Sequence, residues 1–485
     1  MRKLDKYDID FRSTTGKIPW VDKIAMSLNS GFAFNVAWII FGYYLMFFYT
    51  DIVGMSAGVA GTIILAARLL DVITDPIIGY LIDNVCLKWG RFRSWMFVGI
   101  LPLTISFVAI FTNLKGATMG TKLVWAAISY SIFGAIGATA TYSPFTGMVM
   151  NMTKNPQERA VIASLQGMFN GISNIVAATF FISLVKLFGH NSADQSKGYF
   201  GAAIVIAAII FICALFVIII SKKYELNRDG SVREHLMQTE HEPFLSQLKN
   251  LAANRPVIIL ITGQIIFQIM LAIRNGVMIY FFQYYWGMED FYVTAVFWNT
   301  VALGVGALLL KPLIKCFGDT NRAYKVVIAV NIVLFAVMFF MVRAMGAEGS
   351  GESIQFGLLF AVFLFSGLAI GSYTSFATVL TLNTVDHSEY IAGKPQAGLI
   401  HAGFGLSITL GAALGGFFFG NILEAIGYVA NAKQSAGTLN SMLFVMFAVP
   451  ALLTLAHFVL QQFFNLTDKQ VAEELQEMKS KKSEA

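Results

Sequence analysis

Two aspartates lie four residues apart in a long apolar segment, where a charge is energetically costly. The segment reads Arg68-Leu-Leu-Asp71-Val-Ile-Thr74-Asp75. A carboxylate near the middle of a membrane costs at least ~2.5–3.5 kcal/mol on insertion scales, and side chains four residues apart share one helix face. Two neighbouring anions repel in a low dielectric, and a proton or a bound cation relieves the repulsion. Because hard cations prefer oxygen ligands, and Thr74 adds a hydroxyl on nearly the same face, the spacing predicts a proton or cation site.

Arg68 leaves an alternative role open for Asp71, because a basic residue three positions away on a helix can pair with it and hold helices together. No basic residue lies at helical spacing from Asp75. Asp83 ends the same segment beside basic residues, where an ion pair is favoured over contact with a ligand. The residues predicted to have gating or structural roles are Arg68, Asp83, Arg91 and Arg159.

The composition indicates the medium that surrounds this segment. Of 485 residues, 56% are hydrophobic and 13% are charged, with a mean hydropathy of +0.67, whereas soluble domains carry about 25% charged residues. A membrane-spanning helix needs about 20 apolar residues, and the apolar runs are too long for β-barrel strands. We predict an all-α membrane protein with twelve transmembrane helices, near residues 24–50, 56–83, 95–113, 121–150, 160–187, 199–221, 256–285, 291–312, 325–343, 354–385, 396–428 and 439–463.

Lysine and arginine are unevenly distributed between the predicted loops. With the N-terminus inside, 26 of the 34 lie on the cytoplasmic side, six in the outer loops and two inside spans. Cytoplasmic loops of membrane proteins carry the excess of these residues. We therefore predict a multi-pass membrane protein with both termini in the cytoplasm, of a composition that suits a bacterial inner membrane. The net charge of +6 follows from this topology and does not indicate nucleic-acid binding.

The longest polar stretch inside the chain divides the twelve spans into two sets of six. We predict an N-terminal bundle at 1–221, a cytoplasmic central loop at 222–255, a C-terminal bundle at 256–463 and a cytoplasmic tail at 464–485. Similar basic turns follow the second span of each set, one containing Gly90 and the other Gly318. This repeat favours the major facilitator architecture, in which the substrate site lies between the halves near mid-membrane.

Other polar side chains inside the spans are candidates for a substrate cavity, because amides and charges in a membrane need a partner or water. Trp38 and Tyr142 carry rings that could stack on a sugar. Helix packing is the alternative for each single amide or aromatic, and a satisfied packing histidine is the alternative for His401. The substrate candidates are Asn35, Trp38, Tyr142, Thr146, Gln166, Asn170, Arg274, Tyr373 and His401.

Several motifs together resemble the glycoside–pentoside–hexuronide:cation symporter family, of which the melibiose permeases are members. The resemblance extends from about Trp20 to about Asp468. It implies a major facilitator fold and symport of a sugar with Na⁺, H⁺ or Li⁺, with no other cofactor. The matching segments are Tyr49-Thr-Asp51, Arg68 to Gly79, Trp89-Gly-Arg-Phe-Arg93, Ser143-Pro-Phe145, Asn155-Pro-Gln-Glu-Arg159 and Thr384-Val-Asp-His-Ser-Glu-Tyr390.

The resemblance also implies roles for individual residues. In the family, two span 2 aspartates bind the cation with the residue before the second one and a span 4 threonine, and these positions match Asp71, Asp75, Thr74 and Thr139. The sugar site departs from the melibiose pattern. The family's charged and tryptophan positions match Asn35, Tyr142, Thr146, a position next to Gln166, and Thr409. A retained cation site beside an altered sugar site makes an α-galactoside doubtful and leaves another glycoside, a pentoside or a non-sugar substrate open.

Alternative functions follow from the same residues. A Na⁺-coupled lysolipid carrier of a related branch shares the span 2 aspartates and fits the loss of sugar-binding charges. A non-transporting membrane receptor would not need these costly aspartates. An enzyme is disfavoured because no nucleophile, metal cluster or phosphate loop is recognisable, and the three cysteines show no metal or disulfide spacing. The predicted partners are a small sugar or glycoside and the lipid bilayer, with no nucleic acid and a monomeric chain.

Overall fold

The computed structural model describes residues 16–153, 155–189, 195–227, 254–346, 353–392 and 397–484. Within these ranges the chain is helical apart from turns and isolated β-bridges, so the predicted all-α class is confirmed. Contacts divide the chain into two compact units, Met1–His241 (unit 1) and Glu242–Ala485 (unit 2). The limits of the central loop stay a prediction, because residues 228–253 lie outside the described ranges.

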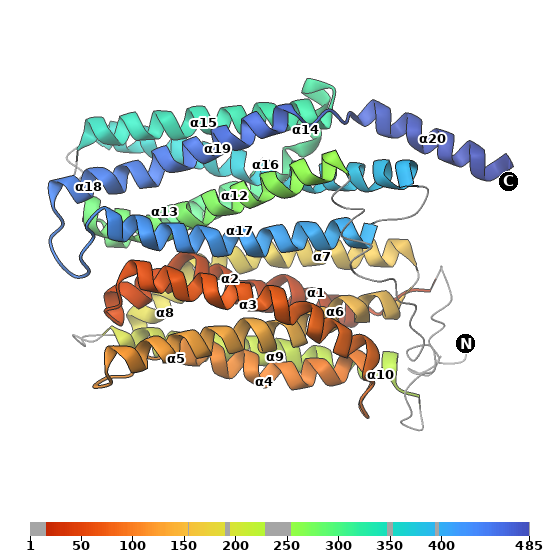
Figure 1. Ribbon diagram of the computed structural model, residues 1–485, viewed down its shortest axis with the longest axis horizontal. Helices are drawn as coiled ribbons and strands as arrows, with labels where there is room; N and C mark the ends of the chain where they lie inside the picture. The colour runs from red at the N-terminus through yellow and green to blue at the C-terminus, as the bar shows by residue number, and fades with distance from the viewer. Residues whose placement is uncertain are drawn as a thin grey trace. The chain divides into compact units, whose positions relative to one another are not determined.

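Unit 1 is a bundle in which α4 packs against α5, α6 and α9, while α7 packs against α1 and α2 (Figure 1). Several of its spans contain π-helical turns, labelled η. Its elements are α1 (Trp20–Leu28), η1 (Asn29–Ala33), α2 (Phe34–Ile40), η2 (Phe41–Leu45), η3 (Phe48–Ile52), α3 (Ala57–Asn84), α4 (Arg91–Ile110), α5 (Met119–Ser131), η4 (Ile132–Ala138), α6 (Thr139–Met152), α7 (Pro156–Ile175), η5 (Val176–Phe180), α8 (Phe181–Phe188), α9 (Ser196–Ile220) and α10 (Lys222–Glu225).

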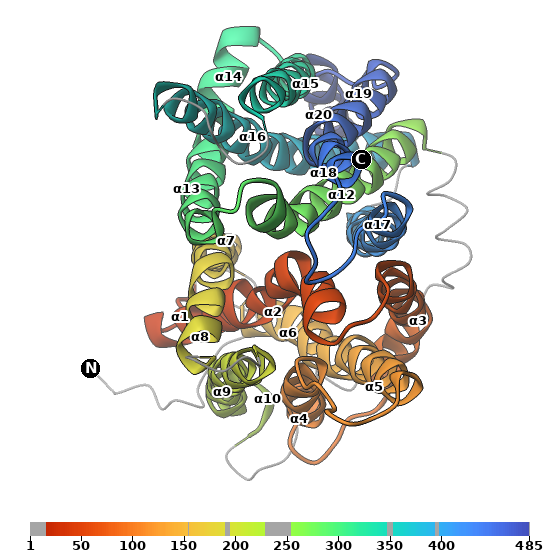
Figure 2. The same ribbon diagram turned by 90° about the vertical axis from the view of Figure 1, so that its left-hand side faces the viewer.

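Unit 2 is a second bundle, in which α12 packs along α17 and α16 packs against α13 and α15 (Figure 2). The helix α20 contacts the far end of α16. The elements of this unit are α12 (Arg255–Tyr280), η7 (Phe281–Tyr285), α13 (Glu289–Leu308), α14 (Leu310–Phe317), α15 (Thr320–Met345), α16 (Ser353–Ala392), α17 (Ala397–Ala425), α18 (Ala436–Leu443), η8 (Phe444–Ala448), α19 (Val449–Gln462) and α20 (Asp468–Glu484).

Twelve helical stretches among the described residues are long and apolar enough to cross a membrane. Each overlaps one of the twelve ranges predicted from hydropathy, so the predicted number of spans is confirmed. The differences are at the ends, because a helix continues past its apolar part where polar residues can face water. The sixth stretch runs to Glu225 and the tenth to Ile391, both beyond the predicted limits.

The basic turn after the second span is closed by an acidic residue of α10, at the end of the sixth span. Gly90 precedes α4 with a φ of 108°, a conformation that glycine adopts most easily. The Glu225 carboxylate then accepts hydrogen bonds from the backbone N of Phe92 at 2.7 Å and of Arg93 at 2.9 Å. Glu225 therefore satisfies N–H groups that a helix N-terminus leaves without partners.

The corresponding turn of unit 2 is built in the same way. Gly318 ends α14 with a φ of 73°, and the Asp319 side chain caps α15 by accepting from the backbone N of Asn321 at 3.0 Å. Asp468, which follows the last span, accepts from the backbone N of Thr320 at 2.8 Å. In both units, an acidic residue at or just beyond the end of the sixth span closes the N-terminus of the third span. This shared feature strengthens the internal repeat seen in the sequence.

Candidate functional site

The Asp71 carboxylate lies inside unit 1 with one oxygen unsatisfied. The residue is 5% exposed. Its Oδ2 lies 3.5 Å from Nη1 of Arg68, one helical turn earlier in α3. Its Oδ1 is buried and has no hydrogen-bond partner among the described residues. Because a buried polar atom without a partner is unfavourable, this oxygen is suited to one further positively charged ligand.

The π-helical segment η4 approaches this carboxylate at Gly134. A Cβ added to Gly134 would lie 2.4 Å from Oδ1 and 2.6 Å from Oδ2 of Asp71, so only glycine leaves the carboxylate its present position. Sequence reasoning missed Gly134. No sequence signal marks it, because the π-helical turn that brings Gly134 and Thr139 together across five residues is visible only in the structure.

Asp75 lies one turn beyond Asp71 and is joined to α6 by Thr139. The Thr139 hydroxyl lies 2.5 Å from Oδ1 of Asp75 and 3.1 Å from the carbonyl oxygen of Gly134. Thr139 is buried, whereas Asp75 is exposed. The Thr74 hydroxyl donates to the carbonyl of Leu70 at 3.1 Å, which leaves its oxygen lone pairs free to accept. The predicted cation residues Asp71, Asp75 and Thr139 are thus gathered around η4, with Thr74 between the two aspartates.

The formal charges of this cluster favour one monovalent cation. With both carboxylates ionised, Asp71 and Asp75 contribute two negative charges and Arg68, which stays protonated, contributes one positive charge. One bound proton or one monovalent cation makes the cluster neutral, which is the favoured state inside a membrane. Carboxylate and hydroxyl oxygens are also the ligand type that hard cations prefer.

Arg68 is held by two aromatic residues from other helices. Its guanidinium carbon lies 3.5 Å from the ring centre of Trp38 on α2, and its Nε donates to the hydroxyl of Tyr130 on α5 at 3.1 Å. The ring that was a candidate for stacking on a sugar therefore contacts a guanidinium. Sequence reasoning missed Tyr130, because nothing in its local sequence separates it from a tyrosine that only packs.

Three predicted substrate residues of unit 1 lie where α2, α6 and α7 meet. The Tyr142 ring stacks on Phe34 with ring centres 4.3 Å apart, and the Gln166 side chain lies near that of Tyr142. Asn35 donates to the carbonyl of Gly31 at 3.2 Å, and Gly31 lies against the backbone of Gln166. All three side chains are partly exposed, so water or a substrate can reach them.

The other substrate candidates on these and later helices do not join the group around Tyr142. Asn170 is exposed one turn beyond Gln166, and its Oδ1 accepts from Asn174 at 3.0 Å. Thr409 is partly buried, with its hydroxyl 3.5 Å from a carbonyl of its own helix. The side chains of Thr146 and His401 lie outside the described residues, so their predicted roles stay predictions.

Arg274 and Tyr373 lie in the interior of unit 2. Arg274 is 1% exposed, and its Nη2 donates to Oδ1 of Asn299 at 3.3 Å. Tyr373 is stacked on Phe267 with ring centres 3.8 Å apart, and its hydroxyl lies 2.8 Å from Nδ1 of His457. Burial of this kind favours a packing role for Tyr373 over contact with a soluble substrate. Sequence reasoning did not single out His457, which sits near one end of its apolar run.

The predicted gating residues have backbone partners at one end of unit 1. The Arg91 Nε donates to the carbonyl of Ile82 at 3.0 Å, and the Arg159 Nε donates to the carbonyl of Thr153 at 2.8 Å. The side chain of Asp83 lies outside the described residues, so its expected ion pair stays a prediction. These contacts fix the connections after the second and fourth spans, which suits a structural role.

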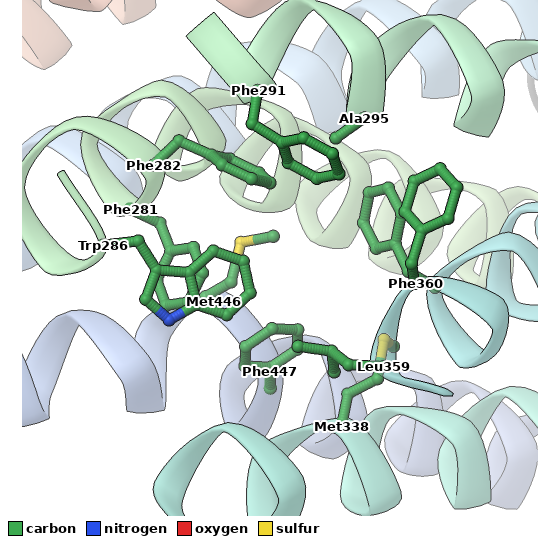
Figure 3. Close-up of a pocket in the computed structure, with 11 residues that line it drawn as sticks. Phe281, Phe282, Trp286, Phe291, Ala295, Met338, Leu359, Phe360, Met446 and Phe447 are labelled. Carbon is green, nitrogen blue, oxygen red and sulfur yellow. The ribbon is translucent and has the colours of Figure 1, made fainter. Parts of the chain in front are cut away.

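A pocket in unit 2 contains none of the predicted site residues. Figure 3 shows aromatic rings and methionines from η7, α13, α15, α16 and η8 around it, including Phe282, Phe291, Phe360 and Met446. Such a lining offers almost no hydrogen-bonding groups to sugar hydroxyls, so we do not place a sugar there.

The chain is similar in sequence to known bacterial transporters. The chain is 28% identical over 430 residues to the isoprimeverose transporter of Lactiplantibacillus pentosus, covering 87% of this chain and 84% of that protein. It is also 28% identical over 438 residues to the inner membrane symporter YicJ of Escherichia coli strain K12, covering 87% of each chain. The crystal structure of a D-xylose-proton symporter has a TM-score of 0.60 at 13% identity and covers 92% of this chain and 97% of that one, which is a likeness of fold alone.

The family comparison covers most of the sequence. A family model described as MFS/sugar transport protein matches residues 28–468, a range that includes the Asp71 cluster, the group around Tyr142 and nearly all of both units. The fold expected from the resemblance to cation symporters is confirmed. The chain belongs to the MFS/sugar transport protein family.

Proposed function

We propose that this chain carries a sugar or glycoside across the membrane together with one monovalent cation, which binds at Asp71, Asp75 and Thr139 with help from Thr74. The observation that carries the proposal is the buried Asp71 carboxylate, whose Oδ1 has no hydrogen-bond partner among the described residues. The net charge of the cluster supports one ion per binding event. Na⁺, Li⁺ and H⁺ all satisfy this charge balance, and carboxylate and hydroxyl oxygens can bind each of them.

The substrate part of the proposal rests on Asn35, Tyr142 and Gln166. Neutral amides and a phenol bind sugar hydroxyls as donors and acceptors without requiring a charge on the substrate. Asn35 and Tyr142 stand where the melibiose permeases, by the resemblance described above, carry aspartates that hold a galactoside. Without these carboxylates, a glycoside or pentoside unlike an α-galactoside is favoured. The similar protein of Lactiplantibacillus pentosus is named an isoprimeverose transporter, so isoprimeverose is the first compound to test.

Ion and sugar are expected to strengthen each other's binding. The ion neutralises the Asp71 cluster on α3 and α6, and Tyr142, a substrate candidate, lies one turn beyond Thr139 on α6. If the ion tightens sugar binding by some factor, the sugar tightens ion binding by the same factor, because the coupling is reciprocal. We further propose that both termini lie in the cytoplasm, as the excess of lysine and arginine on that side supports.

The test is uptake into proteoliposomes that contain the purified full chain. Isoprimeverose, other glycosides, pentosides, glucuronides and one lysolipid would each be offered with an inward Na⁺ gradient, an inward H⁺ gradient or neither. The variant is Asp75→Asn. Its matched control is Glu473→Gln, which makes the same carboxylate-to-amide change at a side chain that is 62% exposed on α20.

Sugar accumulation that needs one gradient in the wild type and the control, and is lost in Asp75→Asn, supports the proposal. Accumulation that is indifferent to both gradients and to Asp75→Asn refutes the coupling and leaves a facilitator. Movement of the lysolipid alone would instead establish the alternative lipid-carrier function.

A further inference from the structure

Arg68 lies close to the Asp71 carboxylate without forming a short, two-bond ion pair with it. The separation of Arg68 Nη1 and Asp71 Oδ2 is 3.5 Å, whereas charge-assisted hydrogen bonds between these groups are about 2.7–2.9 Å. Arginine and a carboxylate commonly form two parallel bonds, yet Oδ1 of Asp71 has no partner among the described residues. Something therefore holds the guanidinium away from a full ion pair.

The contacts of Arg68 identify what holds it. The face of the guanidinium is 3.5 Å from the Trp38 ring centre, and Nε is engaged by the Tyr130 hydroxyl. A cation over an aromatic face is attracted by the ring, most strongly by tryptophan. The contact between Trp38 and Arg68 joins α2 to α3, and the one with Tyr130 joins α3 to α5.

Trp38 itself has little freedom to follow the arginine. Its ring packs edge to face against Phe41 at 5.8 Å and against Phe133 at 5.1 Å, measured between ring centres. Phe41 and Phe133 are buried. The tryptophan is thus a fixed surface, and the position of the guanidinium is set by it.

We propose that Trp38 is a positioning residue of the cation site, which holds Arg68 back from Asp71 and keeps Oδ1 open for the coupling ion. Without the ring, Arg68 closes on both oxygens of Asp71 and occupies the site as a tethered cation. Trp38 then determines ion affinity and is not a platform for the sugar. This inference rests on the proposed function, because it assumes that the ion binds at Asp71.

The test measures ion binding without any sugar. The purified full chain in detergent is titrated with NaCl, LiCl or acid, with choline chloride holding the ionic strength, and the ion-dependent rise of the unfolding temperature gives the half-saturating concentration. For Trp38→Leu we expect that concentration to rise about ten-fold, the equivalent of ~1.4 kcal/mol and the scale of a partly desolvated cation–π contact. Trp38→Phe keeps a ring and should change it by less than about three-fold.

Two further variants separate positioning from packing. Phe48→Leu removes a buried ring of unit 1 that packs on Phe111 and Tyr199 and has no ring contact with Trp38 among the described residues. It should leave the half-saturating concentration within about two-fold of wild type, because distant sites without shared partners act independently. In an Arg68→Gln background, Trp38→Leu should have no further effect, because the tryptophan acts only through the arginine. A double-mutant cycle of this kind isolates the coupling between the two side chains.

The outcomes are distinguishable. An unchanged ion response in Trp38→Leu, or a loss that persists in the Arg68→Gln background, overturns the positioning role while leaving the proposed function intact. Weaker sugar binding with unchanged ion binding also overturns it and restores the sugar-stacking role. A wild type that responds to none of the three ions refutes the cation site itself, and the inference with it.

Discussion

At the scale of single residues, Gly134 shows how strictly the ion site is shaped. Because a Cβ at this position would lie 2.4 Å from Asp71 Oδ1, Gly134→Ala must displace the carboxylate. We expect its half-saturating ion concentration to rise at least about ten-fold, or ~1.4 kcal/mol, in the same thermal titration. The control is Gly79→Ala on α3, where a Cβ meets nothing within 4 Å. Equal ion responses of the two variants would show that Gly134 has no special role.

The Thr139 hydroxyl is a second residue whose contribution can be separated. It lies 2.5 Å from Asp75 Oδ1, and hydrogen bonds to charged groups contribute about 1.5–3 kcal/mol. We expect Thr139→Val to weaken the ion response by about ten-fold or more, since shape is kept and the oxygen is lost. Thr139→Ser restores the oxygen and should recover most of the response. If serine behaves like valine, the methyl group and not the hydroxyl is what the site needs.

The residues of the ion site divide into those that the sequence can reveal and those that it cannot. Asp71 and Asp75 stand out because a charge in an apolar run is rare and their spacing places them on one face. Arg68 and Tyr130 are 62 positions apart, and Thr139 and Asp75 are 64 apart. Such pairs meet only through helix packing, so Thr139 entered by resemblance and Tyr130 was missed altogether.

At the scale of elements, the π-helical segment η4 explains why the site could not be drawn from helical periodicity. An ordinary helix places residues three and four apart on one face. Gly134 and Thr139 are five apart, yet the Thr139 hydroxyl lies 3.1 Å from the carbonyl oxygen of Gly134. Hydropathy does not distinguish an α-helix from a π-helix here, because the residues of both are equally apolar. The extra residue per turn next to a cation cluster fits the tendency of π turns to occur at functional sites.

The acidic caps Glu225 and Asp468 yield a prediction about stability. Glu225 is fully buried and receives hydrogen bonds from two backbone N–H groups of α4. Replacing it with glutamine removes the charge and leaves only one acceptor oxygen, so we expect about 1–2 kcal/mol of lost stability and an unfolding temperature lower by a few degrees. Asp468→Asn should lower it less, because Asp468 is only partly buried.

The measurement is thermal unfolding of the purified chain at fixed ion concentration. Glu473→Gln, on an exposed part of α20, is the control and should leave the midpoint unchanged, because surface substitutions of this kind are usually within about ±0.5 kcal/mol. If Glu225→Gln unfolds like this control, the cap does not stabilise unit 1. The ion response should persist in all three variants, because none of them touches the Asp71 cluster.

At the scale of the whole molecule, the number of spans was predictable from the apolar runs of the sequence. Backbone groups in lipid must be hydrogen-bonded within the span, so a run of apolar residues has almost no choice but to form a helix. The direction in which the helices cross the membrane is a separate property, which depends on where lysine and arginine lie relative to the bilayer.

Two native cysteines can test that direction without altering the site. Cys86 follows the second span and Cys316 lies in α14 after the eighth, and both are exposed. If both termini are cytoplasmic, a membrane-impermeant maleimide should label both thiols in sealed inside-out vesicles and neither in right-side-out vesicles. Burial raises the pKa of the Cys86 thiol, and nearby Glu225 adds a smaller effect in the same direction. Less of the reactive thiolate is therefore present at a given pH. We expect labelling of Cys86 to increase steadily from pH 7 to pH 9. Detergent-solubilised protein supplies the control in which both react, and labelling confined to right-side-out vesicles would invert the proposed topology.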